Sequence, residues 1–388
     1  MSEYREQIMQ MLEALKDGYI KRNGENITVL SEKLFSADNP PVIIGTSNSE
    51  WCFGLDECNA IIASDWESWG NVSIDVDSVF VHQSGSMGCF FVRAGVEYNF
   101  CESEVKYQSY MNLMEKIATS DESAMVRSSQ ILWFLSHLLH TRGTGERKYI
   151  WDLTISGITH MVEGEPKIKY MQFSLPVSAA FPDERMDSNT EAKAGYEKER
   201  GMICAYAKQS CTSSSGLAEA LSAQLSKVTQ LSLDDGQDNL FLGFDGAAYH
   251  APAFMEYLMG LTKDESEFRV DAADMIVHEE EQSFSFCGVG LYTRKLSTEK
   301  ELNHVLGNIS RYVNSAEDKK ESLFRLRRDL ALALKEASVS SVHTAPFRFE
   351  GMGRKGAGNV PLIEYLQLSY PFNWILEQKT DKAINIER

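Results

Sequence analysis

The sequence is poor in long apolar runs, in cysteine pairs and in positive charge, and each shortage excludes a class of protein. Its longest apolar run, residues 131–135, falls far short of the roughly 20 residues that cross a bilayer. The N-terminal residues lack the apolar core of a signal peptide, so we expect a cytoplasmic protein with no membrane partner. The seven cysteines include no Cys-x-x-Cys pair, which favours reduced, buried thiols.

Acidic residues outnumber basic ones by 56 to 38, which gives a net charge of −18. A field of that sign repels a phosphate backbone, and the basic cluster at 319–328 is interleaved with acidic residues, so we expect no nucleic-acid partner. The hydrophobic content of 43% and charged content of 24% are typical of a soluble globular protein. A length of 388 residues is comfortable for two domains.

One eleven-residue pattern occurs twice, at 166–176 and again at 361–371, exactly 195 positions later. The two segments read PKIKYMQFSLP and PLIEYLQLSYP, and they are identical at six of the eleven positions. Apolar and polar residues largely alternate between the flanking prolines, which predicts a strand in each case. Unrelated segments agree at about one position in fifteen, so the pattern indicates a duplicated domain.

Other anchors keep the same register in the two halves. Gly45 precedes His82 by 37 positions, and Gly243 precedes His278 by 35. Both glycines follow an apolar strand-like run, at 42–44 and 240–242. We therefore predict a first copy at 1–180, a polar linker at 181–190 and a divergent second copy at 191–388.

Within each half, helical patterns come first and strand patterns come last. In the first half, apolar stripes predict helices at 3–22, from about Ile27 to Leu34, and from about Leu55 to Trp66. Strand patterns dominate the rest, although residues 125–140 favour a helix. This order indicates an α+β fold with two tandem cone-shaped domains, each a curved antiparallel sheet wrapped over its N-terminal helices.

The first half resembles the SnoaL-like branch of the nuclear transport factor 2-like superfamily. The resemblance lies in the run Gly45-Thr46…Glu50-Trp51…Gly54…Asp65-Trp66 and in the closing strand at 168–176. It implies a cone-shaped α+β barrel with a pocket, often paired through its sheet, and hence a pseudo-dimer within this chain, with a homo-oligomer as an alternative. Gln172 and Gln367 stand where that family usually has His, which weakens a proton-transfer role at this position.

Seven residues are candidates for ligand binding in the two cones. His82 and His278 occupy matching strand positions and could exchange protons, or could simply end a strand facing water. Trp51 and Trp151 suit the rim of a pocket for a flat molecule or could be core, and Tyr249 matches Trp51 in the second half. The ligand-binding candidates are Trp51, His82, Trp151, Gln172, Tyr249, His278 and Gln367.

Three other features of the sequence do not predict a metal site, a phosphate loop or a buried base. His137 and His140 have a metal-ligand spacing but no third partner, so we expect no metal, and nothing in the sequence calls for a cofactor. The glycine-rich stretch 351–358 lacks the spacing of a phosphate loop and is interpreted as a hairpin loop. No acidic residue stands out as a buried base; Asp152 alternates with Trp151 and is assigned to the surface.

Two functions remain open at this stage, and the sequence does not decide whether the protein is an enzyme. The first is binding of a small apolar or aromatic molecule in a cone, with isomerase-, cyclase- or dehydratase-type chemistry as an addition. The second is a non-catalytic scaffold or assembly module. A cavity of several hundred Å³ with a polar group at its base favours the first, and a cone filled by aromatic side chains favours the second.

Overall fold

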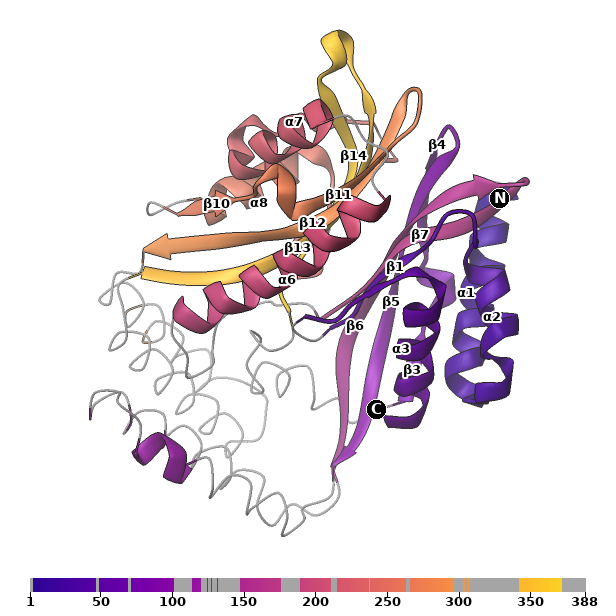
Figure 1. The fold of residues 1–388 in the computed structure, drawn as a ribbon, viewed down its shortest axis with the longest axis horizontal. Helices are drawn as coiled ribbons and strands as arrows, with labels where there is room; N and C mark the ends of the chain where they lie inside the picture. The colour runs from indigo at the N-terminus through magenta and orange to yellow at the C-terminus, as the bar shows by residue number, and fades with distance from the viewer. Residues whose placement is uncertain are drawn as a thin grey trace.

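Two seven-stranded sheets form the framework of the part of the chain that the computed structural model describes (Figure 1). The described residues are 3–46, 49–68, 71–100, 114–119, 147–175, 189–210, 215–236, 238–262, 266–295 and 342–371, with a few isolated positions. The first sheet has the order β2-β1-β7-β6-β5-β3, with β4 paired to β5. Its strands are β1 (Val42–Ile44), β2 (Trp51–Phe53), β3 (Asn71–Ile74), β4 (Phe80–Ser84), β5 (Met87–Phe100), β6 (Arg147–Val162) and β7 (Glu165–Ser174).

The second sheet follows the same plan, strand for strand. Its order is β9-β8-β14-β13-β12-β10, with β11 paired to β12. Its strands are β8 (Phe241–Leu242), β9 (Ala248–Tyr249), β10 (Glu267–Arg269), β11 (Met275–Glu279), β12 (Ser283–Lys295), β13 (Val342–Lys355) and β14 (Pro361–Ser369). The α+β class and the two tandem sheet-and-helix units predicted from the sequence are confirmed.

The register of the closing strands is also the same in both sheets. Gln172 of β7 lies opposite Ile44 of the parallel strand β1, and Gln367 of β14 lies opposite Leu242 of β8. Each closing strand therefore lies between the long strand that precedes it in the chain and a short strand from the start of its half. The two glutamines occupy equivalent positions, one in each sheet.

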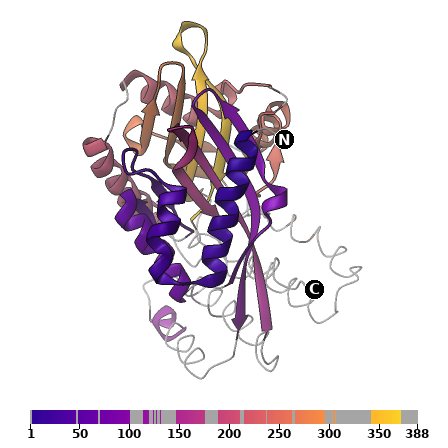
Figure 2. The same cartoon turned by 90° about the vertical axis from the view of Figure 1, so that its right-hand side faces the viewer.

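Helices cover one face of each sheet (Figures 1 and 2). Those of the first half are α1 (Glu3–Lys21), α2 (Ile27–Leu34) and α3 (Gly54–Ser68), and those of the second are α7 (Ser215–Ser226) and α8 (Ala251–Leu261). The buried residues of α1 recur every three or four positions from Tyr4 to Tyr19, so one stripe of the helix packs on the sheet. Met171 and Phe173 of β7 belong to this helix-covered core.

Helix α6 (Asn189–Ser210) has no counterpart among the residues of the first half that the structure describes. The sequence predicts that the second half opens on two helices in the manner of the first. Instead α7 makes the contacts with β10, β11 and β14 that α1 makes with β3, β4 and β7, whereas α6 contacts mainly β12 and β13. Helix α6 lies across β12 and β13, on the side of the second sheet that faces the first sheet (Figure 1).

In each sheet, glycines lie opposite phenylalanines on the neighbouring strand and leave room for their rings. Gly157 lies opposite Phe90, and Gly351 lies opposite Phe286 at the matching place in the second sheet. A Cβ added to Gly157 would come 2.7 Å from the Phe90 ring, and one added to Gly351 would come 2.4 Å from the Phe286 ring. Glycine is used because a phenylalanine ring lies over the strand at each site.

This packing also corrects the interpretation of the glycine-rich stretch at 351–358. The first five of these residues belong to β13 and pair with β12 and β14, so they are not a loop. The turn itself is a short helical segment at Ala357–Asn359. The alternating glycines leave room for aromatic rings, and a loop is not required to explain them.

Substituting Gly157 tests this packing. We expect Gly157→Ala to destabilise the protein by about 1–3 kcal/mol, because the new methyl group meets the Phe90 ring and the carbonyl of Tyr170. Urea melts measure the change. Gly201→Ala in α6 is the matched control, since nothing lies within 4 Å of its added Cβ and alanine favours a helix. Equal stability of the two variants would contradict the packing argument.

Some predictions lie outside the described residues. The helix expected at 125–140, with His137 and His140, is among them, as is most of the linker at 181–190. Helix α6 begins at Asn189, two residues before the predicted start of the second copy. Among the described residues, no helix is both long and apolar enough to cross a membrane.

Candidate functional site

The two sheets pack against each other through the faces opposite α1, α2 and α3 in the first half and opposite α7 and α8 in the second, with α6 on the inner face of the second sheet. Side chains from both halves form this second apolar cluster, which includes Tyr170 and Ile158 from the first sheet and Tyr365 and Met352 from the second. Side chains alternate along a strand, and Met171 and Phe173 point toward the helices. Gln172, between them, therefore points toward the other sheet.

Gln172 and Gln367 lie in this contact and are fully buried. Gln172 Nε2 donates to Ser369 Oγ, and Gln367 Nε2 donates to Ser174 Oγ at 2.8 Å. The two bonds are reciprocal, as in a two-fold interface where each partner presents the same surface. Ligand binding by these glutamines stays a prediction; the contacts that we observe for them join the sheets.

Trp51 is also buried between the halves. Its Nε1 donates to Glu199 Oε2 of α6 at 2.9 Å, and the same carboxylate accepts a bond from the backbone N–H of Ser49 at 2.7 Å. Arg348 of β13 forms a bidentate pair with Glu199, with N···O distances of 2.8 and 3.1 Å, and donates to the carbonyl of Gly45 at 2.6 Å. The hairpin that carries Trp51 is therefore fastened to the second half.

The remaining predicted site residues lie apart from one another. Tyr249 is partly buried, donates to Asp245 Oδ2 at 2.6 Å and stacks on Tyr257. His82 lies in β4 opposite Cys89, and its Nε2 is buried without a partner. For Trp151 the structure describes only the backbone, which lies in β6 opposite Val96.

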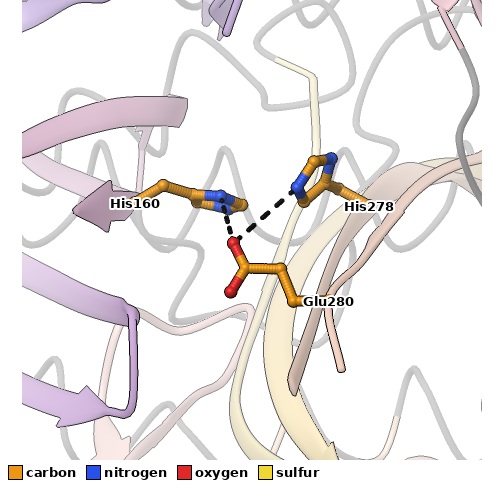
Figure 3. Close-up of side chains that lie close together, drawn as sticks. All are labelled: His160, His278 and Glu280. Carbon is orange, nitrogen blue, oxygen red and sulfur yellow. Dashed lines mark ion pairs between the residues drawn. The ribbon is translucent and has the colours of Figure 1, made fainter. Parts of the chain in front are cut away.

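His278 is brought next to two residues that sequence reasoning did not select. Figure 3 shows His160 of β6, His278 of β11 and Glu280, which follows β11, pointing toward one another. Glu280 Oε1 lies 3.3 Å from His160 Nδ1 and 3.9 Å from His278 Nε2. The sequence predicts that His278 ends its strand beside a polar turn, and that turn supplies the Glu280 carboxylate.

A half-buried carboxyl group in the first half was also missed. Asp65 of α3 accepts a 2.7 Å hydrogen bond from the hydroxyl of Tyr19 of α1, which is fully buried. Burial raises the pKa of Asp65 to about 7, although the bond from Tyr19 and the charge of Arg22 act in the opposite direction. Such a carboxyl group is poised to gain or lose a proton near neutral pH.

The surroundings of this pair are aromatic. The Tyr19 ring makes an edge contact with Trp66 and a tilted contact with Phe173, with centroids 6.4 Å apart in each case. Burial also raises the pKa of Tyr19 well above its ordinary value, so its phenol stays a hydrogen-bond donor. A sequence signal for Asp65 existed: it falls on the apolar stripe of α3, three residues after the buried Ile62.

The space beneath the helices is filled differently in the second half, whose tyrosine–aspartate hydrogen bonds join Tyr249 to Asp245 and Tyr196 to Asp274. There, stacked aromatic rings fill the space between α8, β10 and the sheet. Phe244 stacks on Tyr370 with centroids 4.1 Å apart, and Phe268 packs on Tyr292 at 4.7 Å and on Phe347 at 5.5 Å. The two halves therefore differ in the chemistry that they present beneath their helices.

A cavity of about 270 Å³ lies between α1 and α2 in the first half. Its lining joins charged residues of both helices, among them Asp17 and Lys33, to the indole of Trp66. Trp66 is thus shared between this cavity and the aromatic surroundings of Tyr19. The indole Nε1 of Trp66 is buried without a hydrogen-bond partner.

No family model and no curated protein matches this sequence. Solved structures that are similar to it cover a little under half of the chain. A nuclear transport factor 2-like superfamily protein from Salmonella enterica is 10% identical over 46% of this chain and 94% of its own, with a TM-score of 0.29. A ketosteroid isomerase-like protein from Erwinia carotovora is 13% identical over 45% of this chain and 98% of its own, with a TM-score of 0.27.

Proposed function

We propose that the first half binds a small, largely apolar molecule beside Asp65 and moves a proton to or from it. The proposal rests on one observation: a half-buried carboxyl group with a pKa near 7 is held by a buried phenol in aromatic surroundings. A general base works best when its pKa lies near the working pH, which an ordinary aspartate does not meet. The reaction class that suits it is proton transfer next to a carbonyl group, as in isomerisation or dehydration.

Tyr19 and Asp65 would have separate roles. The carboxylate of Asp65 would accept the proton, and the Tyr19 hydroxyl would hold the carboxylate in place at 2.7 Å. Because Tyr19 is fully buried and its phenol stays protonated, it positions Asp65 without itself titrating. Trp66 and Phe173 would exclude water from the pair, which strengthens its electrostatic effect.

We propose a different role for the second half, that of a non-catalytic partner within the same chain. Its helix-covered space is occupied by the stacked rings of Phe244, Tyr370 and their neighbours. Its other face covers the first sheet through the reciprocal Gln–Ser bonds, which support an intrachain pseudo-dimer. The second half would therefore act as a scaffold. This proposal does not depend on the proposal that Asp65 transfers a proton.

Binding is tested with 2-naphthol, a flat apolar molecule whose hydroxyl can donate to a carboxylate. At pH 8 we expect 2-naphthol to raise the melting temperature of the wild-type chain, because a ligand that binds only the folded state stabilises it. Asp65→Asn should abolish most of the shift. Asp56→Asn, an exposed carboxyl at the start of the same helix, is the control and should keep it. Equal shifts in all three proteins would overturn the proposed site.

The pKa of Asp65 is tested by ¹³C NMR of the aspartate carboxyl groups. We expect one aspartate to titrate near pH 7, absent from Asp65→Asn. In Tyr19→Phe it should titrate at higher pH, since the hydrogen bond from Tyr19 lowers the pKa of Asp65. An Asp65 that titrates near pH 4 in the wild-type chain would remove the basis for proton transfer.

A further inference from the structure

Three metal-ligating side chains converge where the two halves meet, away from Asp65. His160 comes from the first sheet, whereas His278 and Glu280 come from the second (Figure 3). One nitrogen of each histidine and one oxygen of Glu280 all lie within 4.8 Å of one another. His160 is 118 positions from His278 and 120 from Glu280 in the sequence, so only the packing of the two sheets brings it to the other two.

The spacing is close to that of a zinc site. Zinc bonds to His nitrogen and carboxylate oxygen are about 2.0–2.1 Å long, so neighbouring ligand atoms in a tetrahedron are about 3.3 Å apart. His160 Nδ1 and Glu280 Oε1 already have that separation, at 3.3 Å. His278 Nε2 lies 3.9 Å from the same oxygen, and the ligand atoms of the three residues all lie within 4.8 Å of one another, so His278 would have to move closer, which a partly exposed side chain can do.

Hydrogen bonds around the cluster hold two of the ligands in the required orientation. His160 Nε2 lies 3.2 Å from Ser285 Oγ in a buried contact, so the other nitrogen, Nδ1, is the one turned toward Glu280. Ser86 Oγ donates to Oε2 of Glu280, which leaves Oε1 facing the histidines. Metal-bound histidines and carboxylates in proteins are oriented by outer hydrogen bonds of this kind.

The donor atoms and their exposure also suit a cation. Two imidazole nitrogens and one carboxylate oxygen are donor atoms that a divalent cation such as zinc accepts. Lys169 is a nearby positive charge, which disfavours a cation at this place. The side chains of His278 and Glu280 are 26% and 32% exposed, so water can complete the coordination.

The equivalent place on the other side of the pseudo-dimer could not bind a metal. The strand registers match His278 with His82, Glu280 with Ser84, and His160 with Arg354. An arginine in place of a histidine and a serine in place of a glutamate remove two of the three ligands. The cluster is thus a feature of one side only, and His82 provides a natural control.

We propose that His160, His278 and Glu280 bind one Zn²⁺ ion, with water in the fourth position, and that this ion ties the two halves together. The proposal is independent of Asp65 and departs from the expectation, drawn from the sequence, that the chain holds no metal. Two histidines and one carboxylate with an open position form a known zinc ligand set.

Calorimetric titration of the chelator-treated full chain with Zn²⁺ tests this directly. We expect one site with a dissociation constant below about 1 μM and a melting temperature that rises with Zn²⁺ concentration. His278→Ala and Glu280→Gln should each weaken this site at least tenfold, and His82→Ala should leave it unchanged. These ligand positions are partly exposed, so the variants are expected to fold.

Co²⁺ spectroscopy separates this site from thiolate sites elsewhere in the chain. The Co²⁺-loaded protein should show tetrahedral d–d bands without thiolate charge-transfer absorption, and His278→Ala should lose them. Thiolate absorption at the first equivalent, or Zn²⁺ affinity that is the same in the wild-type chain and in both ligand variants, would overturn the proposal. So would the absence of binding to the wild-type chain.

Discussion

Arg348→Met is expected to destabilise the protein by about 3–5 kcal/mol, the largest loss that we predict for any single change. Arg348 and Glu199 are 1% and 0% exposed, so removing the guanidinium leaves a carboxylate buried without its counter-ion. The bonds that remain to Glu199, from Trp51 Nε1 and the Ser49 N–H, do not neutralise its charge. Urea melts at pH 7 measure the loss, and Trp51 fluorescence is expected to report on the same transition.

Two further variants separate charge burial from simple loss of contact. Glu199→Gln/Arg348→Met removes both charges and keeps an acceptor for Trp51, so it should recover at least half of the stability lost in the single variant. Lys21→Met is the control, because both side chains of the Lys21–Asp17 ion pair are more than half exposed and such pairs contribute little to stability. A loss below 1 kcal/mol for Arg348→Met would contradict the argument.

The plan of the fold could be predicted because it is recorded in local, repeated patterns. The eleven-residue segments at 166–176 and 361–371 contain β7 and β14, and the apolar runs before Gly45 and Gly243 are the short strands that pair with them. Alternation with a period of two identifies a strand without knowledge of its neighbours. The buried stripe of α1 could be predicted for the same reason, because its apolar residues recur with helical spacing.

The contact between the sheets could not be predicted in this way. Alternation places Gln172 on the face opposite Phe173, but it does not say what covers that face. Here the cover is a second sheet of the same chain, so Gln172 meets Ser369 and Trp51 meets Glu199. A buried glutamine or tryptophan is compatible with a pocket or with an interface, and only the tertiary arrangement distinguishes them.

Asp65 and the His160–Glu280 pair could not be identified from the sequence for the same reason. Asp65 lies on an apolar helical stripe, but its pKa is raised by burial in the folded protein and lowered in part by the hydrogen bond from Tyr19, 46 positions away in the sequence. His160 and Glu280 have no common motif because they belong to different halves and meet only across the sheet contact. Long-range pairing of single residues leaves no periodic trace in a sequence.

Glu350 is a fully buried carboxyl group in the contact between the sheets and makes the stability of the protein pH-dependent. It is fully buried in β13, accepts a hydrogen bond from Ser156 of the first sheet and a longer one from Tyr365, and has one oxygen without a partner. Burial raises its pKa from 4.5 to about 7, so near neutral pH the folded protein holds a proton that the unfolded chain has released.

The direction of the pH dependence of stability follows from this difference in bound protons. Between about pH 4.5 and pH 7 the folded state binds more protons at Glu350 than the unfolded state, so the free energy of unfolding falls as pH rises through this window. The contribution is fully lost above pH 7 and amounts to up to about 3 kcal/mol, since each pKa unit corresponds to about 1.4 kcal/mol. Glutamine has the same shape and no charge to bury.

We therefore expect Glu350→Gln to be more stable than the wild-type chain at pH 8, by up to about 3 kcal/mol, and close to it at pH 5. The difference between the two proteins in urea melts at each pH isolates Glu350 from other titrating groups. Glu364→Gln is the control in the neighbouring strand, since Glu364 is paired with Arg354, and it should lose stability at pH 8. A Glu350→Gln variant whose advantage is the same at both pH values would show that the carboxyl group is not protonated in the folded protein.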